Sequence, residues 1–378
     1  MHQQDPERAA RRASWRRPPA VISRPKRVRL VRHPRDVLLD AQSTAASLPV
    51  CDHYCGVEAR MRKSLALQAE MSQEFGACVF DVTLDCEDGA PVGGEKDHAN
   101  MVVTLANHAQ EAIKNIASGI VPRIAVRVHP VDHPVFEQDV NIIVGGAAAS
   151  LCHLMIPKIE TVADVDRAAQ LVDHVATRTG RASVLPLHVL IESPASVHRA
   201  FEIAAHPRVQ SISFGLMDFV SAHGGAIPSS AMSIHAGPGG DGLDQFSHPL
   251  VVRAKLEIAS ACHAHGKVPA HCVVTEFNDL AAVQAAASRA ARALGYTRMW
   301  SIHPSQIRPI LAAFAPPEQE IELATHIMMA AVQADWAPIS FGGKLHDRAS
   351  YRYFWQVLER AHQTGRRLPA EARAYFPT

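Results

Sequence analysis

The sequence has no long run of apolar residues and almost no net charge. No apolar stretch approaches the roughly 18 residues that a membrane span requires. The 38 Lys and Arg residues against 37 Asp and Glu residues leave a formal net charge of +1. Such a balance gives no overall attraction to nucleic acid or to an anionic membrane. We therefore expect a protein that binds neither, with any site for a polyanion being local.

Cysteine is also scarce, and the motifs of several common sites are missing. The seven cysteines form no disulfide framework, so we expect reduced thiols in a cytoplasmic protein. Residues 262–272 hold two Cys and three His, but their spacing matches no common zinc site. The Gly-rich residues 237–242 lack the preceding strand and the following Lys of a phosphate-binding loop.

The first 35 residues depart from this balance. They contain eleven Lys and Arg residues against Asp5 and Glu7, and they lack the apolar segment of a secretory signal. Their composition predicts a disordered basic tail over residues 1–40. The alternative is an arm that contacts phosphate or a partner subunit.

From residue 47 onward, short apolar runs alternate with longer helical patterns. This alternation is typical of βα units and a parallel sheet. There are eight such runs, the number that closes a (β/α)8 TIM barrel of the α/β class. The runs span residues 47–54, 78–87, 123–130, 152–160, 185–193, 209–218, 267–276 and 299–305.

A C-terminal extension follows the eighth run. The pattern predicts a helix over 317–334, a Gly-containing loop over 340–347 and a last helix over 349–362. We expect the barrel to occupy residues 41–315, and the C-terminal helices and a lid to occupy 316–378.

Polar residues follow the predicted strands, at the end of a barrel where enzymes place their chemistry. Several carboxylates and an arginine converging on one mouth would suit a hard divalent cation and an anionic substrate. These residues are Glu87, Asp88, Arg127, Lys158, Glu160, Glu192, Asp218 and His303.

Glu192 and Asp218 end two consecutive runs. An ionised carboxylate at the end of LHVLIES needs a compensating positive charge, and a cation shared with Asp218 would supply it. Two carboxylates that leave the other positions to water and substrate favour Mg²⁺ over Ca²⁺. The alternative is that each carboxylate caps the following helix.

Arg127 lies in an otherwise apolar strand, so its guanidinium must point into the mouth or pair with an interior carboxylate such as Asp85 or Glu87. Both interpretations can hold together. A planar bidentate donor favours a substrate carboxylate over other anions.

Together these segments resemble one family. LDCEDGAP, VRVHP, MIPKIE, VLIESPASV, AAHPRVQSISFGLMDF and WSIHPSQI occur in the order typical of the HpcH/HpaI aldolase and citrate lyase β-subunit-like family, which includes malyl- and citramalyl-CoA lyases. Three features depart from its pattern: CDHYCG replaces the usual PG in the first strand, His129 stands where Asn is common, and residues 231–248 form an insertion.

The resemblance implies a set of site residues. It places Mg²⁺, with Mn²⁺ as an alternative, on Glu192 and Asp218, and a substrate carboxylate on Arg127. It adds Glu87 and Asp88 near metal-bound water and Lys63 at the coenzyme A phosphates. GGKLHD resembles a lid that closes over a neighbouring subunit, which implies Asp347 as the catalytic acid or base and a homo-oligomer, a trimer or hexamer, with exchanged lids.

The expected function is a Mg²⁺-dependent carbon–carbon lyase. It would interconvert a malyl-, β-methylmalyl- or citramalyl-CoA type thioester with a 2-oxo acid and an acyl-CoA. The alternatives are a coenzyme A-independent pyruvate aldolase, a malyl-CoA thioesterase, and a non-catalytic barrel that binds acyl-CoA or nucleic acid.

Overall fold

The computed structural model describes residues 33–39, 48–113, 120–235 and 242–376. The predicted basic tail therefore falls largely outside the described residues. Its described end instead forms helix α1 (Pro34–Leu38), which the sequence pattern did not indicate. No helix in the described part of the chain is both long and apolar enough to cross a membrane.

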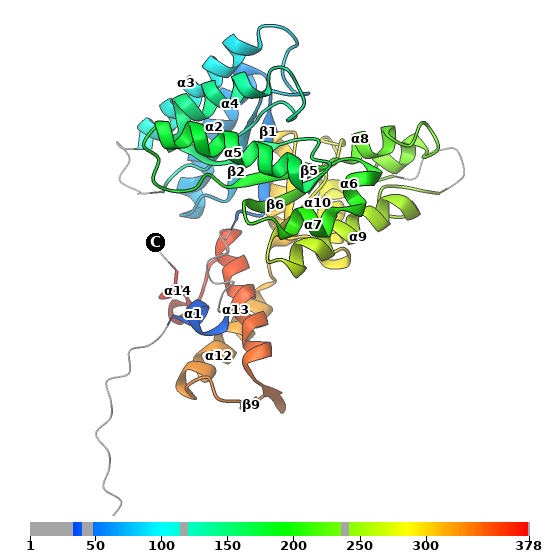
Figure 1. Ribbon diagram of the computed structural model, residues 1–378. Helices are drawn as coiled ribbons and strands as arrows, with labels where there is room; N and C mark the ends of the chain where they lie inside the picture. Colours follow the sequence, from blue (N-terminus) through cyan, green and yellow to red (C-terminus); the bar gives the residue numbers. More distant parts are fainter. Residues whose placement is uncertain (1–32, 40–47, 114–119, 236–241, 377–378) are drawn as a thin grey trace, which may run out of the picture. The chain divides into compact units, whose positions relative to one another are not determined.

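Eight strands form a closed parallel barrel in chain order, β1 to β8, so the predicted TIM barrel is confirmed (Figure 1). Each predicted apolar run overlaps one strand. The strands are β1 (Cys51–Cys55), β2 (Phe80–Asp85), β3 (Ile124–Arg127), β4 (Leu151–Ile156), β5 (Leu187–Ile191), β6 (Val209–Phe214), β7 (Val268–His271) and β8 (Arg298–Ser301).

Helices connect successive strands and bury one apolar face against the barrel. In α5, for example, Thr161 and Asp164 form a capping box, and Val165 and Val172 lie on the buried face. The helices are α2 (Glu58–Phe75), α3 (Glu95–Ile113), α4 (Phe136–Ala147), α5 (Val162–Arg178), α6 (Pro194–His198), α7 (Ala200–Ala205), α8 (Leu216–Ser221), α9 (Pro249–Ala264), α10 (Leu280–Ala293) and α11 (Ile307–Phe314).

The C-terminal extension has its own apolar cluster, in which Leu38 of α1 joins side chains of the C-terminal helices. The predicted loop over 340–347 is instead an antiparallel hairpin. Gly342 and Gly343 adopt φ of 57° and 74°, the left-handed conformation that a two-residue hairpin turn requires. The elements are α12 (Glu318–Gln333), β9 (Ile339–Phe341), β10 (Lys344–His346), α13 (Arg348–Gln363) and α14 (Ala370–Arg373).

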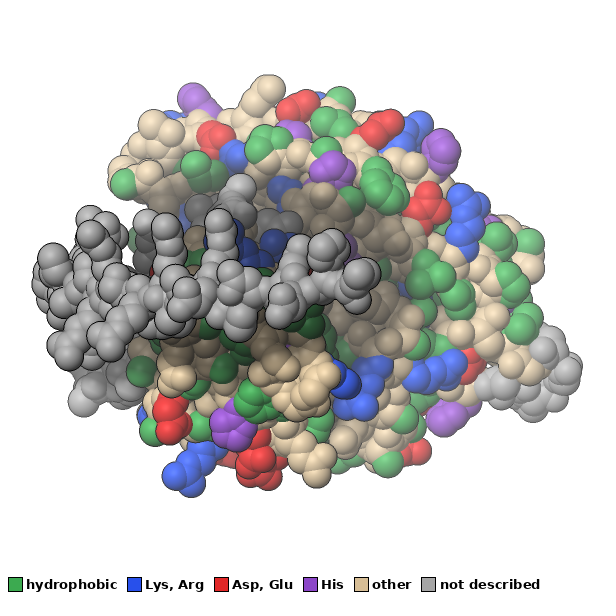
Figure 2. All heavy atoms as spheres, turned by 90° about the horizontal axis from the view of Figure 1, so that it is seen from below, with side chains coloured by type: hydrophobic (Ala, Val, Ile, Leu, Met, Phe, Trp, Pro, Cys, Tyr) green, Lys and Arg blue, Asp and Glu red, His purple; other side chains and the backbone are tan. Residues whose placement is uncertain are grey.

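The described part of the surface in Figure 2 carries acidic and basic side chains intermixed with apolar ones. This distribution agrees with the near-neutral composition of the chain.

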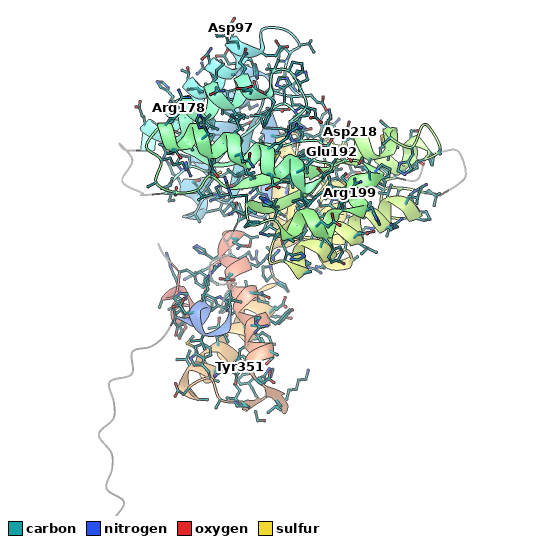
Figure 3. All side chains as sticks on the ribbon, in the orientation of Figure 1. Asp97, Arg178, Glu192, Arg199, Asp218 and Tyr351 are labelled. Carbon is teal, nitrogen blue, oxygen red and sulfur yellow. The ribbon has the colours of Figure 1, made fainter. Side chains whose placement is uncertain are left out.

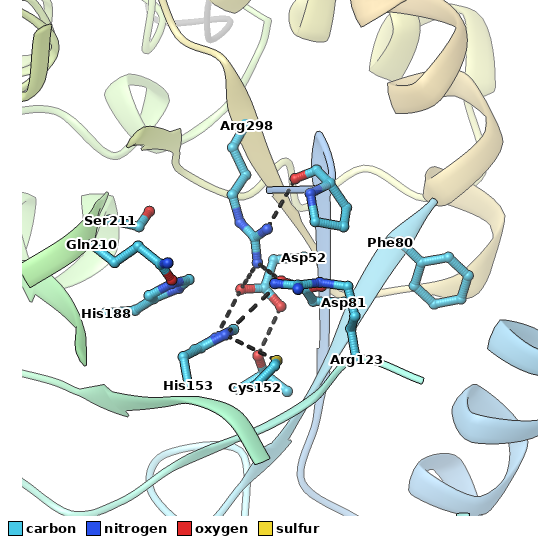
Figure 4. Close-up of polar contacts among 12 residues, drawn as sticks. Asp52, Phe80, Asp81, Arg123, Cys152, His153, His188, Gln210, Ser211 and Arg298 are labelled. Atoms are coloured by element: carbon cyan, nitrogen blue, oxygen red, sulfur yellow. Dashed lines mark hydrogen bonds and ion pairs between the residues drawn. The ribbon is translucent and has the colours of Figure 1, made fainter. Parts of the chain in front are cut away.

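A charged layer fills the base of the barrel (Figure 4). Arg298 Nη2 lies 2.8 Å from Asp52 Oδ2 and 2.6 Å from Asp81 Oδ2, and Arg123 Nε lies 2.5 Å from Asp81 Oδ1. Two guanidinium groups thus balance two buried carboxylates, which is the condition for keeping charge in a protein interior.

An apolar layer lies above this base. Met155, Leu190, Ala270 and Trp300 form a buried cluster, against which Tyr54 packs. These side chains come from β4, β5, β7 and β8 and meet in the interior of the barrel. The layer separates the charged base from the carboxyl ends of the strands.

We expect Arg298→Met to be strongly destabilising, because it leaves Asp52 and Asp81 without their shared counter-charge. Breaking a buried ion pair from one side typically costs about 3–5 kcal/mol. Urea unfolding would measure the change. The matched control is Arg308→Met, whose partner Glu74 is 49 % exposed, and its cost should stay below about 1 kcal/mol. Equal losses in the two variants would contradict the role of the charged layer.

Candidate functional site

The end of β2 holds Arg127 in a fixed orientation. Arg127 Nε donates to Asp85 Oδ1 at 2.7 Å and Nη2 donates to Asp85 Oδ2 at 2.5 Å. The same carboxylate accepts the backbone N–H groups of Glu87 at 3.0 Å and Gly89 at 2.8 Å. The guanidinium is therefore anchored on one side by a bidentate pair, as the sequence predicted for Asp85.

Aromatic rings of the apolar layer lie against the same guanidinium. Its carbon is 5.2 Å from the ring centre of Tyr54 and 6.0 Å from that of Trp300. Burial opposes the charge of Arg127, but Asp85 and Glu87 raise its pKa above the ordinary value. Arg127 is thus a permanent cation at the mouth of the barrel.

A second cation, Lys158, follows β4 at the same mouth. Its Nζ donates to Glu87 Oε1 at 2.7 Å and lies 3.5 Å from Asp88 Oδ2. Glu87 Oε2 lies 3.1 Å from Arg127 Nη1, so Glu87 contacts both cations. Despite partial burial, Glu87 raises the pKa of Lys158 above its usual value.

Glu192 follows β5 and is 5 % exposed. Its pKa is raised to about 8, first by burial and then by the negative charge of Asp218. Asp218 lies in the first turn of α8, just beyond the end of β6 rather than on the strand itself. Figure 3 shows the two labelled residues next to each other.

Gly215 permits this arrangement. A Cβ atom at this position would lie 2.4 Å from Glu192 Cγ and 2.8 Å from Glu192 Cδ, so a larger residue would displace the carboxylate. In the segment FGLMD, the backbone at Gly215 therefore packs closely against Glu192, and Asp218 follows three residues later.

We call this group the mouth cluster, and its charges are unbalanced. Five carboxylates surround two cations, and the negative charges of Asp218 and Glu87 add to the effect of burial in raising the pKa of Glu192. One divalent cation bound by these carboxylate oxygens would reduce the excess negative charge, so the residues present fit Mg²⁺. The members are Asp85, Glu87, Asp88, Arg127, Lys158, Glu192 and Asp218.

A different group offers metal ligands at the base of the barrel. Ligand atoms of Asp52, His153 and His188 lie within 4.8 Å of one another, and all three residues are buried (Figure 4). Burial lowers the pKa of both histidines, to about 3 for His188. Since Arg298 and Arg123 already balance the carboxylates there, a divalent ion would add two uncompensated charges. We assign this group a structural role.

Two other predicted site residues lie on α2 and at the N-terminus of α13. Lys63 is exposed on α2. Asp347 caps α13, accepting hydrogen bonds from the backbone N–H groups of Ala349 at 3.0 Å and Ser350 at 3.3 Å. The roles predicted for both residues stay predictions.

Two further polar residues at strand ends contact other partners. Glu160 Oε2 accepts a hydrogen bond from Ser193 Oγ at 2.8 Å. The His303 ring stacks on Phe277 with 4.9 Å between ring centres.

The sequence placed Lys158 among the polar residues of the mouth without giving it a role, and it did not indicate Gly215. Lys158 was visible as a charged residue at a strand end, but its link to Glu87 joins loops 71 residues apart. Gly215 had a local signal, because a glycine directly after an apolar strand often marks a close approach.

A parallel eight-stranded barrel with a charged cluster at the carboxyl ends of its strands defines a (β/α)8 enzyme. The model of the HpcH/HpaI aldolase/citrate lyase family matches residues 64–304. The chain therefore belongs to this family and is a carbon–carbon lyase of the citrate lyase β-subunit-like type.

Individual relatives agree with this membership. An L-malyl-CoA/β-methylmalyl-CoA lyase from Cereibacter sphaeroides is 30 % identical over 302 residues, which cover 76 % of this chain and 90 % of the lyase. The crystal structure of a citrate lyase from Burkholderia xenovorans is 46 % identical, with a TM-score of 0.72, and covers 92 % of this chain and 100 % of that one.

A more distant structure shows the fold alone. The CitE protein from Mycobacterium tuberculosis, in complex with magnesium, acetoacetate and coenzyme A, is 21 % identical with a TM-score of 0.58. The match covers 83 % of this chain and 98 % of that one.

We expect Glu192→Gln to stabilise the metal-free protein at alkaline pH. The pKa of Glu192 is raised from 4.5 to about 8, so folding favours the protonated form. This contribution is fully present below about pH 4.5 and is lost as the pH rises through about 8. Above pH 8 the variant should melt a few °C higher than the wild type, since about 1 kcal/mol corresponds to about 2 °C.

Melting curves between pH 5 and pH 9 in a chelating buffer would test this. Asp97→Asn, at an exposed position on α3, serves as the control and should change little. A melting temperature of Glu192→Gln that stays below the wild type above pH 8 would contradict the raised pKa.

Proposed function

We propose that the protein is a Mg²⁺-dependent lyase that interconverts a 3-hydroxyacyl-CoA bearing a terminal carboxylate with a 2-oxo acid and an acyl-CoA. Malyl-CoA is the simplest such substrate. The observation that supports it most directly is the surplus negative charge around Glu192 and Asp218, beside the fixed guanidinium of Arg127.

Glu192 and Asp218 would hold the magnesium ion. When bound, Mg²⁺ supplies a Lewis acid for the oxygens of the oxo-acid portion. The magnesium, acetoacetate and coenzyme A bound by the Mycobacterium tuberculosis protein, and the name of the Cereibacter sphaeroides lyase, support this choice of cofactor and substrate.

Arg127 would bind the substrate carboxylate. Its Nε and one Nη2 N–H donate to Asp85, which leaves the second Nη2 N–H and those of Nη1, the atom that lies 3.1 Å from Glu87 Oε2. A carboxylate could therefore be bound without breaking the pair with Asp85. The buried partner also prevents the guanidinium from rotating, so the substrate would be held in one orientation.

Cleavage requires two proton movements. The hydroxyl group loses a proton, the carbon–carbon bond breaks, and its electron pair moves to the α-carbon of the thioester. A proton then adds to that carbon and completes the acyl-CoA. In the condensation direction the same carbon loses the proton.

Asp347 would exchange the proton at the α-carbon, entering the site from a neighbouring subunit. Asp347 contacts the first turn of its own helix at the end of the β9–β10 hairpin, on an extension that follows the barrel. Lys63, on the first turns of α2, would contact the coenzyme A phosphates of the substrate. Both roles are proposed from the resemblance of MRKSLAL and GGKLHD to the family.

A direct assay tests the proposed function. Purified protein with Mg²⁺ should release a 2-oxo acid from at least one of malyl-, methylmalyl- and citramalyl-CoA, and Asp218→Asn should abolish the release because the cation loses one of two proposed ligands. A parallel reaction with pyruvate and an aldehyde tests the coenzyme A-independent alternative. The proposal would be overturned if the only product were the aldol of pyruvate and the aldehyde in the second reaction. It would also be overturned if Asp218→Asn released the 2-oxo acid as fast as the wild type.

We expect Asp347→Asn to lose about 10²- to 10⁴-fold in turnover while keeping its fold, since Asn caps a helix as well as Asp. Because the residue would act across a subunit boundary, oligomers reassembled from Asp347→Asn and Glu192→Gln chains should regain activity. Each such interface can combine an intact Glu192 with an intact Asp347. Full activity of Asp347→Asn alone would show that another group moves the proton.

A further inference from the structure

Lys158 has an unusual backbone. Its φ of 54° places it in the left-handed region, which costs a residue with a side chain about 1–2 kcal/mol. This conformation lets one residue reach two parts of the site. Its backbone N–H lies 3.4 Å from Glu192 Oε1, and its ammonium group lies 2.7 Å from Glu87 Oε1. Strain of this kind is retained where the surrounding contacts require it, often at functional sites.

Glu87 is shared between the two cations of the mouth cluster. Lys158 binds Oε1, while Oε2 accepts the backbone N–H of Asp88 at 2.9 Å and lies 3.1 Å from Arg127 Nη1. Oε2 is thus the oxygen that faces Arg127, while Oε1 faces Lys158. The side chain of Glu87 is 4 % exposed, so water offers its carboxylate little alternative.

Arg127 would form a stronger pair with Glu87 if the carboxylate were released. Bidentate contacts between guanidinium and carboxylate are stronger than contacts through one oxygen. A turn of the Glu87 carboxylate toward Arg127 would bring both oxygens against its Nη1 and Nη2 atoms. That turn would occupy N–H groups of Arg127 that Asp85 does not use.

We propose that Lys158 is a positioning residue that keeps Arg127 available for the substrate carboxylate. By binding Oε1, it restricts Glu87 to a one-oxygen contact with the guanidinium. Lys158 thus acts through Glu87 rather than on the substrate. This inference rests on the proposed function for the role of Arg127, but the competition of two cations for Glu87 is independent of that function.

Steady-state kinetics in the condensation direction, at saturating Mg²⁺, test the consequence. In Lys158→Met we expect KM for the 2-oxo acid to rise about 10- to 100-fold, the range of one charge-assisted hydrogen bond. KM for the acyl-CoA should change less than about twofold. Lys158→Arg should recover much of the loss. Lys96→Met, at an exposed position in the first turn of α3, is the matched control and should behave as the wild type.

A double variant separates this role from a merely structural one. In a Glu87→Gln background the neutral amide cannot compete for Arg127, so adding Lys158→Met should cause little further loss. Losses that multiply in the double variant, or KM values for both substrates that rise together, would overturn the proposal. Lys158→Gly removes the ammonium and relieves the backbone strain, so it should share the kinetic loss of Lys158→Met but unfold at a higher urea concentration than that variant.

A crystal structure of Lys158→Met tests the competition without any activity. Both oxygens of Glu87 should lie on Arg127, and a Glu87 side chain left in its present place would refute the inference. If the wild type catalyses no cleavage while Glu87 turns as expected, the proposed function fails and the competition stands.

Discussion

The ion pair of Asp85 and Arg127 is the interaction on which the site depends. Asp85 is the last residue of the buried strand β2, and its carboxylate also binds the backbone of the loop that carries Glu87. One side chain therefore orients the guanidinium and shapes the neighbouring loop. Because a buried charge must be compensated, neither partner can change alone without exposing the other to an apolar interior.

Compensation of charge also explains the difference between the two ends of the barrel interior. At the base, two arginines balance two aspartates, and the layer is complete. At the mouth, carboxylates outnumber cations, and burial together with the charge of Asp218 raises the pKa of Glu192. The requirement that buried charges be balanced therefore indicates a structural role for the base of the barrel and a cation site at its mouth.

Much of this arrangement could be predicted from the sequence, because the signals are local. Eight short apolar runs that alternate with helical patterns identified the strands, and the polar residues after them identified the carboxylates and Arg127. The pairing of Arg298 with Asp52 and Asp81 could not be predicted, since it joins the first two strands to the last. The hairpin of β9 and β10 was missed because each strand has only three residues.

The left-handed backbone of Lys158 was equally invisible, since nothing in the letters MIPKIE marks a positive φ at a lysine. Helix α1 escaped prediction for another reason. It has five residues, and its buried Leu38 packs into a cluster made by helices some 300 positions later in the chain. Contacts of such long range depend on the completed fold.

The apolar layer of Met155, Leu190, Ala270 and Trp300 has an evolutionary consequence. It insulates the charged base from the mouth with side chains that carry no formal charge. Substitutions that retune the chemistry at one end are thereby shielded from the network that maintains folding at the other. A barrel whose mouth and charged base are separated in this way can acquire new substrates while the charged base stays unchanged.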